Sequence, residues 1–234
     1  MCRLSGGADS SSSTRPRGLF RNAAEGTDAR ISVRREAGEG YNRTALRKIL
    51  ILGCSGAGKS TLARQVGRIT GLPIIHLDQH YWRPGWQEPD RETWRCKVGA
   101  LIAQPRWVMD GNFGGTLMLR LTAADTVIFL DFPTRVCLSR VLRRVARSLG
   151  RTRGDMAPGC PERFDLSFLR YVCRYRREDR SRHLGAIAAF SGKVIVLHRP
   201  AEISDLVLGL PARGEDGVSS TRRSPGSESR ETAC

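Results

Sequence analysis

The stretch ILILGCSGAGKST at residues 49 to 61 passes from an apolar run directly into a glycine-rich turn. Gly53, Gly58, Lys59 and Ser60 satisfy the pattern GxxxxGK[ST], which occurs between a strand and a helix. Glycines allow backbone N–H groups to turn inward around phosphate oxygens, and the start of the following helix adds partial positive charge. The stretch therefore predicts a strand, a phosphate-binding loop and a helix, in that order.

This loop predicts a binding site for ATP together with Mg²⁺. We expect Lys59 to reach the β- and γ-phosphates and the Ser60 hydroxyl to bind the metal ion. The residues assigned to the nucleotide are Gly53, Cys54, Ser55, Gly56, Ala57, Gly58, Lys59, Ser60 and Thr61. The same loop serves kinases, GTPases and ATPases, so the motif predicts nucleotide binding without specifying the reaction.

Beyond the loop, short β-branched runs alternate with longer helical patterns, which is typical of βα units around a parallel sheet. The expected strands are residues 48–52, 73–77, 106–110, 126–130 and 193–197. The expected helices lie near residues 59–70, 90–104, 134–149, 165–190 and 201–208. The pattern predicts an α/β P-loop NTPase with a five-stranded parallel sheet flanked by helices.

Both ends of the chain differ in composition from its middle. Residues 1–45 and 209–234 are rich in Ser, Gly and Arg and show no sustained periodicity. Such segments bury too little apolar surface to offset the entropy lost on ordering, so we expect both to be disordered. The expected folded domain is residues 46–208.

Three acidic residues follow predicted strands. Asp78, Asp110 and Asp131 would lie at the carboxyl edge of the sheet, where ligands bind in such folds. An aspartate beside the phosphate-binding loop can hold the water shell of Mg²⁺ or an acceptor hydroxyl, while a helix N-cap or a turn is the alternative role for each. We assign Asp110 to Mg²⁺ and catalysis, and Asp78 to acceptor binding.

The segment HLDQHYWRPGW carries three aromatic residues, Tyr81, Trp82 and Trp86, in a loop with Pro and Gly. Exposed rings of this kind can stack on a ligand or line an acceptor pocket, and they can equally cover the core beneath a long loop. We assign Tyr81 and Trp82 to acceptor binding. His76 and His80 are expected to pack or to lie at the surface.

The net charge of +16 is concentrated in one part of the chain. Residues 135–182 hold fourteen arginines against five acidic residues. Arg140, Arg143, Arg144 and Arg147 recur at helical spacing and are expected to share one face of a helix. The opposite face would carry Leu138, Val141, Leu142, Val145 and Leu149. Because like charges in a row repel one another, we expect a polyanion to bind the arginine face.

After this helix, the Gly and Pro spacing of GRTRGDMAPGC prevents long regular structure and predicts a mobile lid at about residues 150–164. A second helix then supplies Arg170 and Arg174, one turn apart. Inward arginines on both sides of a lid suit phosphoryl transfer, where the protein contributes positive charge and excludes water. We assign catalysis to Arg140, Arg144 and Arg174, and acceptor binding to Arg170.

Residues 47 to 208 resemble the nucleoside-monophosphate-kinase-like P-loop proteins through GCSGAGKSTLA, HLDQHYWRPGW, VMDGNF, ADTVIFLDFP and GRTRGDMAPGCPE. The similarity is greatest to the bacterial topology modulation proteins (FlaR-type), a group often described as adenylate-kinase-like. In adenylate kinases a strand-end DG pair supplies the aspartate near Mg²⁺, which matches Asp110. Their first lid arginines follow a strand-end proline, which matches Arg140 and Arg144 after Pro133.

The chain departs from adenylate kinases directly after the DG pair. Where those enzymes have FPR, whose arginine holds the α-phosphate of AMP, this chain reads DGNFGG without an arginine. The departure argues against AMP as the acceptor. In its place we assign acceptor binding to Asn112 and Arg120.

Two functional hypotheses follow. The first is a kinase that transfers the γ-phosphoryl group of ATP to a nucleotide or a small molecule. The second is a DNA-associated regulator, as the name of the topology modulation group implies, which binds nucleic-acid phosphates through the arginine segment. No recognition helix or RNA-stacking motif is visible, which favours the kinase over sequence-specific readout. Nucleotide sensing or hydrolysis without transfer is a third alternative.

Seven scattered cysteines without CxxC spacing argue against a disulfide scaffold and against a zinc site. No apolar run reaches the ~18 to 20 residues of a membrane span, and the start of the chain lacks the apolar core of a secretory signal. We therefore expect a cytoplasmic protein without a membrane partner.

Overall fold

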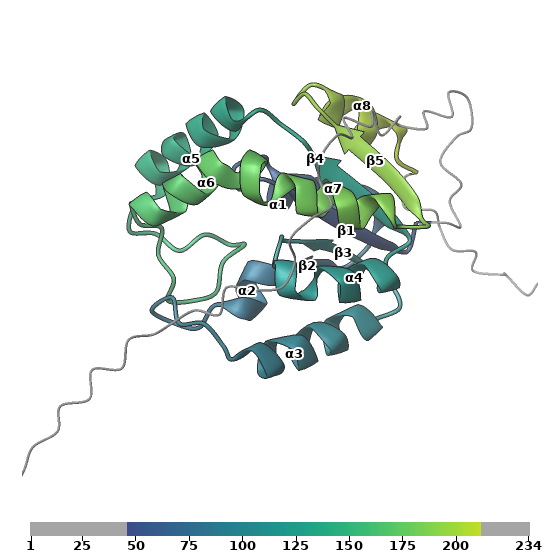
Figure 1. Cartoon of the computed structure of the whole chain (residues 1–234), viewed down its shortest axis with the longest axis horizontal. Coiled ribbons are helices and arrows are strands. Elements are labelled where there is room, and N and C mark those ends of the chain that lie inside the picture. The colour runs from purple at the N-terminus through teal and green to yellow at the C-terminus, as the bar shows by residue number, and fades with distance from the viewer. Residues whose placement is uncertain (1–45, 212–234) are drawn as a thin grey trace, which may run out of the picture. The chain divides into compact units, whose positions relative to one another are not determined.

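The computed structural model describes residues 46–211, which alternate strands and helices as predicted (Figure 1). The predictions of disorder for residues 1–45 and for residues 212–234 lie outside the described residues. The described fold runs slightly past the expected boundary at residue 208, because Leu210 is buried in the core.

The sheet has five parallel strands in the order β2-β3-β1-β4-β5. Their bounds are β1 (Lys48–Gly53), β2 (Ile74–His76), β3 (Trp107–Asp110), β4 (Thr126–Leu130) and β5 (Lys193–Leu197). The parallel α/β fold is confirmed, and each predicted strand end lies within one residue of the observed one. β1 is central, so the loop that follows it opens at the middle of the carboxyl edge.

Helices connect the strands and cover both faces of the sheet (Figure 1). Their bounds are α1 (Lys59–Thr70), α2 (Leu77–Tyr81), α3 (Arg91–Ala103), α4 (Leu117–Ala123), α5 (Thr134–Ser148), α6 (Leu166–Glu178), α7 (Arg180–Ala188) and α8 (Glu202–Gly209), with a 3-10 turn at Gly114–Thr116. The sequence analysis missed α2 and α4, because helices this short span too few turns to produce a recognisable period.

Side chains of β1 alternate between two hydrophobic clusters, one on each face of the sheet. Ile49 and Ile51 belong to the cluster that α1, α5, α6 and α8 cover, and Leu50 and Leu52 belong to the cluster that α3, α4 and α7 cover. All four side chains are fully buried. This is the pattern of a central strand that is covered on both sides.

The single helix predicted over residues 165–190 is wrong, because the chain forms α6 and α7 with Asp179 between them. Val172 of α6 packs into one hydrophobic cluster, whereas Ile187 of α7 packs into the other. The two clusters lie on opposite faces of the sheet. A straight helix cannot reach both faces, so the helix has to break.

The four arginines predicted to share one face of α5 fall into two pairs. Arg143 and Arg147 are exposed, whereas Arg140 and Arg144 are half-buried. The two half-buried residues lie one turn apart on the side of α5 that adjoins the core. The spacing of the four arginines on α5 keeps them on one side of the helix, as predicted, although they differ in exposure.

The apolar face of α5 is narrower than predicted. Val141 and Val145 are buried and Leu138 packs partly against the core. Leu142 and Leu149, however, are 44% and 61% exposed.

None of the helices between residues 46 and 211 has the length and apolar character needed to cross a membrane.

Candidate active site

The loop between β1 and α1 adopts a backbone conformation that favours glycine. Gly53, Gly56 and Gly58 have φ values of 139°, 86° and 103°. A Cβ atom on Gly56 would lie 2.3 Å from the carbonyl oxygen of Cys137, so the loop also packs closely against α5. Conformation and space both require glycine at this position.

The first turn of α1 presents backbone N–H groups to the space in front of the loop. Gly58 is the N-cap and makes no side-chain capping bond, and the first turn contains no acidic residue. Lys59 lies over the loop, where Nζ donates to the carbonyl oxygens of Gly53 at 2.9 Å and Cys54 at 3.2 Å. Backbone donors and an ammonium group side by side suit a phosphate chain.

Two of the loop residues assigned to the nucleotide turn their side chains into the core. Cys54 and Ala57 are buried, and only their backbone atoms are available to a ligand. A hydrogen bond with the Cys137 thiol, together with burial, raises the pKa of the Cys54 thiol. The loop residues that line the cavity described below are Ser55, Gly56, Gly58, Lys59, Ser60 and Thr61.

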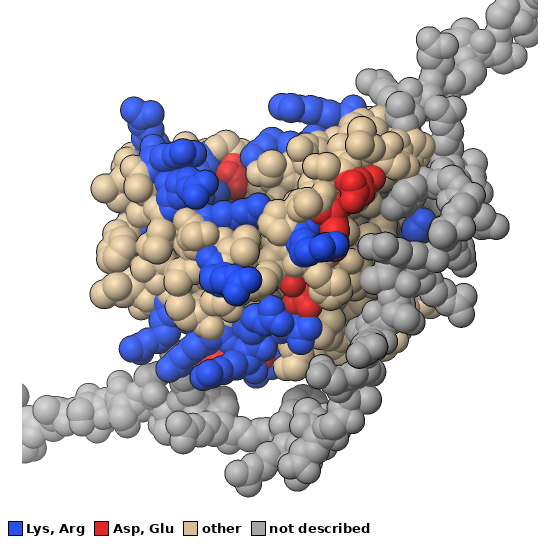
Figure 2. All heavy atoms as spheres, turned by 90° about the horizontal axis from the view of Figure 1, so that it is seen from above, with Lys and Arg blue, Asp and Glu red and all other residues tan. Residues whose placement is uncertain are grey.

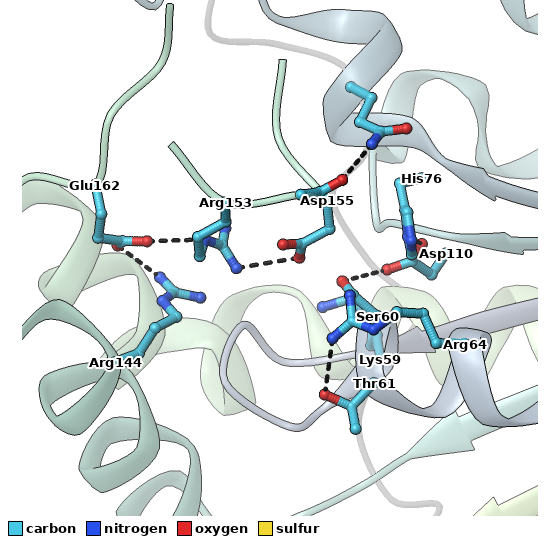
Figure 3. Close-up of polar contacts among 12 residues, drawn as sticks. Lys59, Ser60, Thr61, Arg64, His76, Asp110, Arg144, Arg153, Asp155 and Glu162 are labelled. Atoms are coloured by element: carbon cyan, nitrogen blue, oxygen red, sulfur yellow. Dashed lines mark hydrogen bonds and ion pairs between the residues drawn. The ribbon is translucent and has the colours of Figure 1, made fainter. Parts of the chain in front are cut away.

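Short hydrogen bonds link the start of α1 to the ends of β3 and β2 (Figure 3). The Ser60 hydroxyl donates to Asp110 Oδ2 at 2.6 Å, and His76 Nδ1 donates to Asp110 Oδ1 at 2.5 Å. β2 pairs with β3 so that His76 stands opposite Asp110. The sequence analysis expected only packing or surface exposure for His76, whereas this buried side chain holds the Asp110 carboxylate in position.

The oxygen atoms of Ser60 and Asp110 suit Mg²⁺. Magnesium prefers oxygen ligands and commonly uses one or two protein groups beside phosphates and water. Among residues 46–211, no group of three or more His, Cys, Asp or Glu side chains could hold a metal ion. The Ser60 and Asp110 pair therefore fits a metal ion that binds together with a nucleotide.

A cavity of about 1080 Å³ extends along the loop. Its wall comes from the loop and α1, from α2 and the segment after it, from α5, and from the starts of α6 and α8. The lid, which we define as residues 149–165 between α5 and α6, completes the wall. The cavity thus joins segments from most of the length of the described chain.

The lid contains an ion-pair network that also binds α5 (Figure 3). The Glu162 carboxylate accepts from Arg144 Nη2 at 3.1 Å and lies 2.9 Å from Arg153 Nε. Arg153 Nη1 in turn donates to Asp155 Oδ2 at 3.1 Å. Glu162 and Asp155 are buried. Removing one member would leave an uncompensated buried charge, so the network fastens the lid to α5.

The lid also contacts the segment that follows α2. The Gly85 N–H donates to the Gly159 carbonyl at 2.9 Å, and the Cys160 thiol donates to the Arg83 carbonyl at 3.2 Å. These hydrogen bonds join the lid to the segment after α2, and residues of both segments line the cavity.

The pKa values of two carboxyl groups at the cavity are shifted in opposite directions. Burial acts to raise the pKa of Asp155, but Arg153 and the Ser60 hydroxyl outweigh it, and the pKa lies below its ordinary value. Burial raises the pKa of Asp78, and Asp110 adds to this effect. Asp155 is thus the stronger acid, and Asp78 is the better proton acceptor.

Arg140 and Arg144 both line the cavity. Arg140 Nη1 donates to the Ala57 carbonyl of the loop at 2.9 Å, and its guanidinium lies 5.8 Å from the centroid of the Phe132 ring. Arg140 therefore ties α5 to the loop, beside Gly58.

The structure does not bring Arg170 and Arg174 to the cavity. Both are exposed on α6, and Arg174 Nη1 lies 3.7 Å from a Glu178 carboxylate oxygen one turn along the helix. Val172 and Tyr175 occupy the side of α6 that faces the core. The roles assigned to these two arginines are corrected accordingly.

Arg120 holds a loop and does not line the cavity. Its side chain is fully buried and donates to the carbonyl oxygens of Gly111 at 2.8 Å and Phe113 at 3.0 Å, and also to that of Asn112. Burial lowers its pKa to about 9. A substrate cannot reach this guanidinium, so the assignment of Arg120 to acceptor binding is corrected.

Asn112 connects the loop to α6. Its Oδ1 accepts from the Gly53 N–H at 3.2 Å, and its Nδ2 donates to the Tyr171 hydroxyl at 3.3 Å. Asn112 does not line the cavity. The side chain predicted to bind the acceptor instead braces the phosphate-binding loop.

Both roles considered for the aromatic residues occur. Tyr81 packs against Trp94 and Phe113, with centroid distances of 4.9 and 4.6 Å, and covers the core. Trp82 and Trp86 line the cavity, as does Asp78. Asp131, the third strand-end acid, instead accepts two hydrogen bonds of 2.7 Å from Arg180.

None of the charged residues of the lid was predicted to have a role from the sequence. Arg153, Asp155 and Glu162 all line the cavity, and so does Arg64 of α1. The spacing RGD within GRTRGDMAPGCPE was the available signal, since it places two opposite charges two residues apart in a segment without regular structure.

The sheet order and the loop define a P-loop protein with nucleoside-monophosphate-kinase-like architecture. Comparisons with protein families and with curated proteins find no match. Solved structures that match include a gluconokinase from Sinorhizobium meliloti 1021, with 17% identity and a TM-score of 0.42 over 70% of this chain and 89% of that one. A shikimate kinase from Acinetobacter baumannii has 18% identity and a TM-score of 0.45 over 71% and 93%. A deoxyadenosine kinase from M. mycoides has 14% identity and a TM-score of 0.38 over 69% of this chain and 96% of that one.

Proposed function

We propose that this protein is an ATP-dependent phosphotransferase that moves the γ-phosphoryl group of ATP onto a nucleotide or a small molecule. The observation that carries the proposal is the position of Arg140 and Arg144 on the wall of the same cavity as Lys59 and Ser60. Phosphoryl transfer needs positioning, positive charge and exclusion of water more than covalent help from the protein. The loop and the lid together supply these conditions.

The strand order supports one direction for ATP in the cavity. Asp110 ends β3, which lies between β1 and β2, and it accepts the Ser60 hydrogen bond. The γ-phosphoryl end of ATP then lies on the β3 side of the loop. The base lies toward the start of α8, where Pro200 and Ile203 line the cavity. The acceptor binds beyond β3, beside the end of β2.

Each residue at the loop has a distinct task in this proposal. Lys59 exchanges its two backbone carbonyl partners for oxygens of the β- and γ-phosphates. Ser60 and Asp110 hold Mg²⁺, which neutralises charge on the phosphate oxygens. Arg140 and Arg144 donate hydrogen bonds to the phosphate chain from the opposite wall, because each guanidinium carries five N–H donors and uses only some of them on protein groups.

The test is to incubate the purified protein with γ-labelled ATP, Mg²⁺ and a panel of nucleotides and small hydroxyl compounds. We expect at least one labelled acceptor, and a loss of about 10² to 10³-fold in kcat for Lys59→Met. Arg68→Met removes an exposed cation of α1 outside the cavity and should keep wild-type activity. Hydrolysis of ATP with no acceptor phosphorylated would contradict the proposal.

A second candidate function is binding of nucleic-acid phosphates. Basic side chains outnumber acidic ones on the face shown in Figure 2. Exposed arginines of α5 and α6 include Arg143, Arg147, Arg170, Arg174 and Arg177. Such binding weakens by about 0.9 log unit per log unit of salt for each phosphate neutralised. A titration of duplex DNA at several salt concentrations tests this candidate, and an affinity that does not change with salt would exclude it.

A further inference from the structure

The end of the cavity beside β2 differs in charge from the end that contains the phosphate-binding loop. Its wall comes from Asp78, Trp82 and Trp86 on one side, and from Gly154 and Asp155 of the lid on the other. This end receives the acceptor if ATP lies as proposed above, so the acceptor class inferred below rests on the proposed function.

A carboxylate without a protein partner lies at this end. Asp78 lines the cavity, and within residues 46–211 its carboxylate has no hydrogen-bond or ion-pair partner. Burial raises the pKa of Asp78; among the charged neighbours, Lys59 and Arg153 act to lower this pKa, whereas Asp110 and Asp155 act to raise it. An anion bound here would face the carboxylates of Asp78 and Asp155, which both line the cavity.

The arginines around this end already have partners. Arg153 is paired with two buried lid carboxylates, at 3.1 and 2.9 Å. Arg163 Nη2 lies 3.4 Å from a carboxylate oxygen of Asp165. Arg64 extends along α1, where its Nη2 lies 3.5 Å from the Thr61 hydroxyl of the phosphate-binding loop. Arg153 and Arg163 are thus paired with carboxylates of the lid, and Arg64 contacts the loop that would hold the phosphates of ATP in the proposed function.

Two indole rings give the same end an apolar wall. Trp82 and Trp86 meet edge to face, with their centroids 5.3 Å apart. Arg163 covers the Trp86 ring at 5.1 Å from its centroid and so holds that ring in place. Aromatic faces pack against the C–H groups of polyols, while carboxylates accept hydrogen bonds from hydroxyl groups.

We propose that the phosphoryl acceptor is a small uncharged polyhydroxy compound, of the sugar or polyol class, which packs against Trp82 and donates a hydroxyl hydrogen bond to Asp78. A nucleoside monophosphate or a hydroxy acid is disfavoured, because its anionic group would meet Asp78 and Asp155 without an unbalanced cation to bind it. Like charges placed together repel one another, which is how such a site excludes a competitor.

The transfer step follows from this placement. The acceptor hydroxyl oxygen forms a bond to the γ-phosphorus as the bond from that phosphorus to the β,γ-bridging oxygen breaks, and ADP is the leaving group. The hydroxyl proton passes to the Asp78 carboxylate. Asp78 then releases the proton to solvent after the phosphorylated product leaves. No oxidant or further reactant is needed.

The experiment compares acceptors that share one carbon skeleton and differ in charge, such as glucose, gluconate and glucose 6-phosphate, beside pentoses, inositol, glycerol and nucleoside monophosphates. The readout is the phosphorylated product by mass spectrometry and kcat/KM from ADP formation. We expect an uncharged compound to be phosphorylated, and its carboxylate or phosphate counterpart to react at least about tenfold less efficiently.

Two outcomes separate the inference from the proposed function. Phosphorylation of a charged compound with higher kcat/KM than its uncharged counterpart would overturn the acceptor class and leave the kinase proposal standing. Absence of a phosphorylated product from every compound would overturn both.

A variant tests the role of Asp78 independently of the panel. Asp78→Asn should lower kcat by about 10² to 10⁴-fold with unchanged ATP affinity, because it removes the proton acceptor. It should also narrow the preference for the uncharged compound over its carboxylate counterpart, which a purely structural role would not do. Asp205→Asn, at an exposed site on α8 outside the cavity, is the matched control. An unchanged preference in Asp78→Asn would overturn the inference.

Discussion

The two ends of the cavity are built in different ways. The loop end consists of backbone groups, held by glycines at positive φ and by the contact of Gly56 with α5. The lid end consists of side chains, in which Arg144 and Arg153 share the Glu162 carboxylate. The first end depends on residues within one short stretch, whereas the second depends on charges that meet only after the chain has folded.

This difference bears on what each end can do. Backbone donors at a helix start bind phosphate in the same way in many proteins, so the loop end predicts a common property. In the proposed function the lid end supplies charges that meet the acceptor, so we expect it to set acceptor specificity. Substitutions at the two ends should therefore have different effects. Three variants test this through ATP affinity, kcat and stability.

The largest effect is expected for Gly56→Ala at the loop end. Its Cβ atom would lie 2.3 Å from the Cys137 carbonyl, and φ is 86°. Positive φ costs about 1–2 kcal/mol with a side chain, and a displacement of about 1 Å can cost 10²-fold, so ATP affinity should fall by roughly 10³-fold. Isothermal titration with an ATP analogue measures this loss.

Gly99→Ala is the control for that variant. Gly99 lies within α3, and a Cβ atom there meets nothing within 4 Å. The substitution should leave ATP affinity unchanged and raise stability by up to about 1 kcal/mol. Equal losses of ATP affinity in both variants would show that the loop geometry is not what binds the nucleotide.

A smaller effect is expected for Arg144→Gln, which removes a cavity-lining cation while keeping a hydrogen-bonding side chain. If Arg144 donates to the phosphate chain, kcat should fall by about 10² to 10³-fold while ATP affinity changes little. Arg143→Gln changes the neighbouring exposed arginine and should have wild-type kcat. Steady-state assays measure kcat for both variants. Equal kcat values would show that Arg144 has no catalytic role.

The smallest effect is expected for Glu162→Gln, which weakens the network of the lid. Glu162 is buried and pairs with two arginines, so the free energy of unfolding should fall by about 1–3 kcal/mol. Glu178→Gln breaks an exposed pair with Arg174 and should change the free energy of unfolding by less than about 1 kcal/mol. Urea denaturation measures the stability of both variants. If Glu162→Gln loses no more stability than Glu178→Gln, the network does not hold the lid.

The sequence predicted the loop end almost completely, because strand, glycine turn and helix are specified by neighbouring residues. The sequence did not predict the helix break at Asp179, because Arg-rich helical sequence continues on either side of this residue. The break is required only because α6 and α7 pack on opposite faces of the sheet. Arg120 resembles a ligand-binding cation in the sequence. Its burial against backbone carbonyls after β3 depends on tertiary packing.

The position of the lid could be predicted from the sequence, but its side-chain contacts could not. Gly and Pro spacing indicated an irregular segment, yet nothing local shows that Glu162 would reach back to Arg144, eighteen residues earlier. The same holds for His76, whose contact with Asp110 follows from the pairing of β2 with β3. Such contacts depend on strand order, which periodicity alone does not reveal.

The central claim is that α5 and the loop act on one phosphate chain, and a crystal structure with Mg²⁺ and a non-hydrolysable ATP analogue tests it most directly. The account predicts Lys59 Nζ and a guanidinium nitrogen of Arg140 or Arg144 within about 3 Å of phosphate oxygens of the same nucleotide. A nucleotide bound on Lys59, with both arginines still contacting only Ala57 and Glu162, would contradict it.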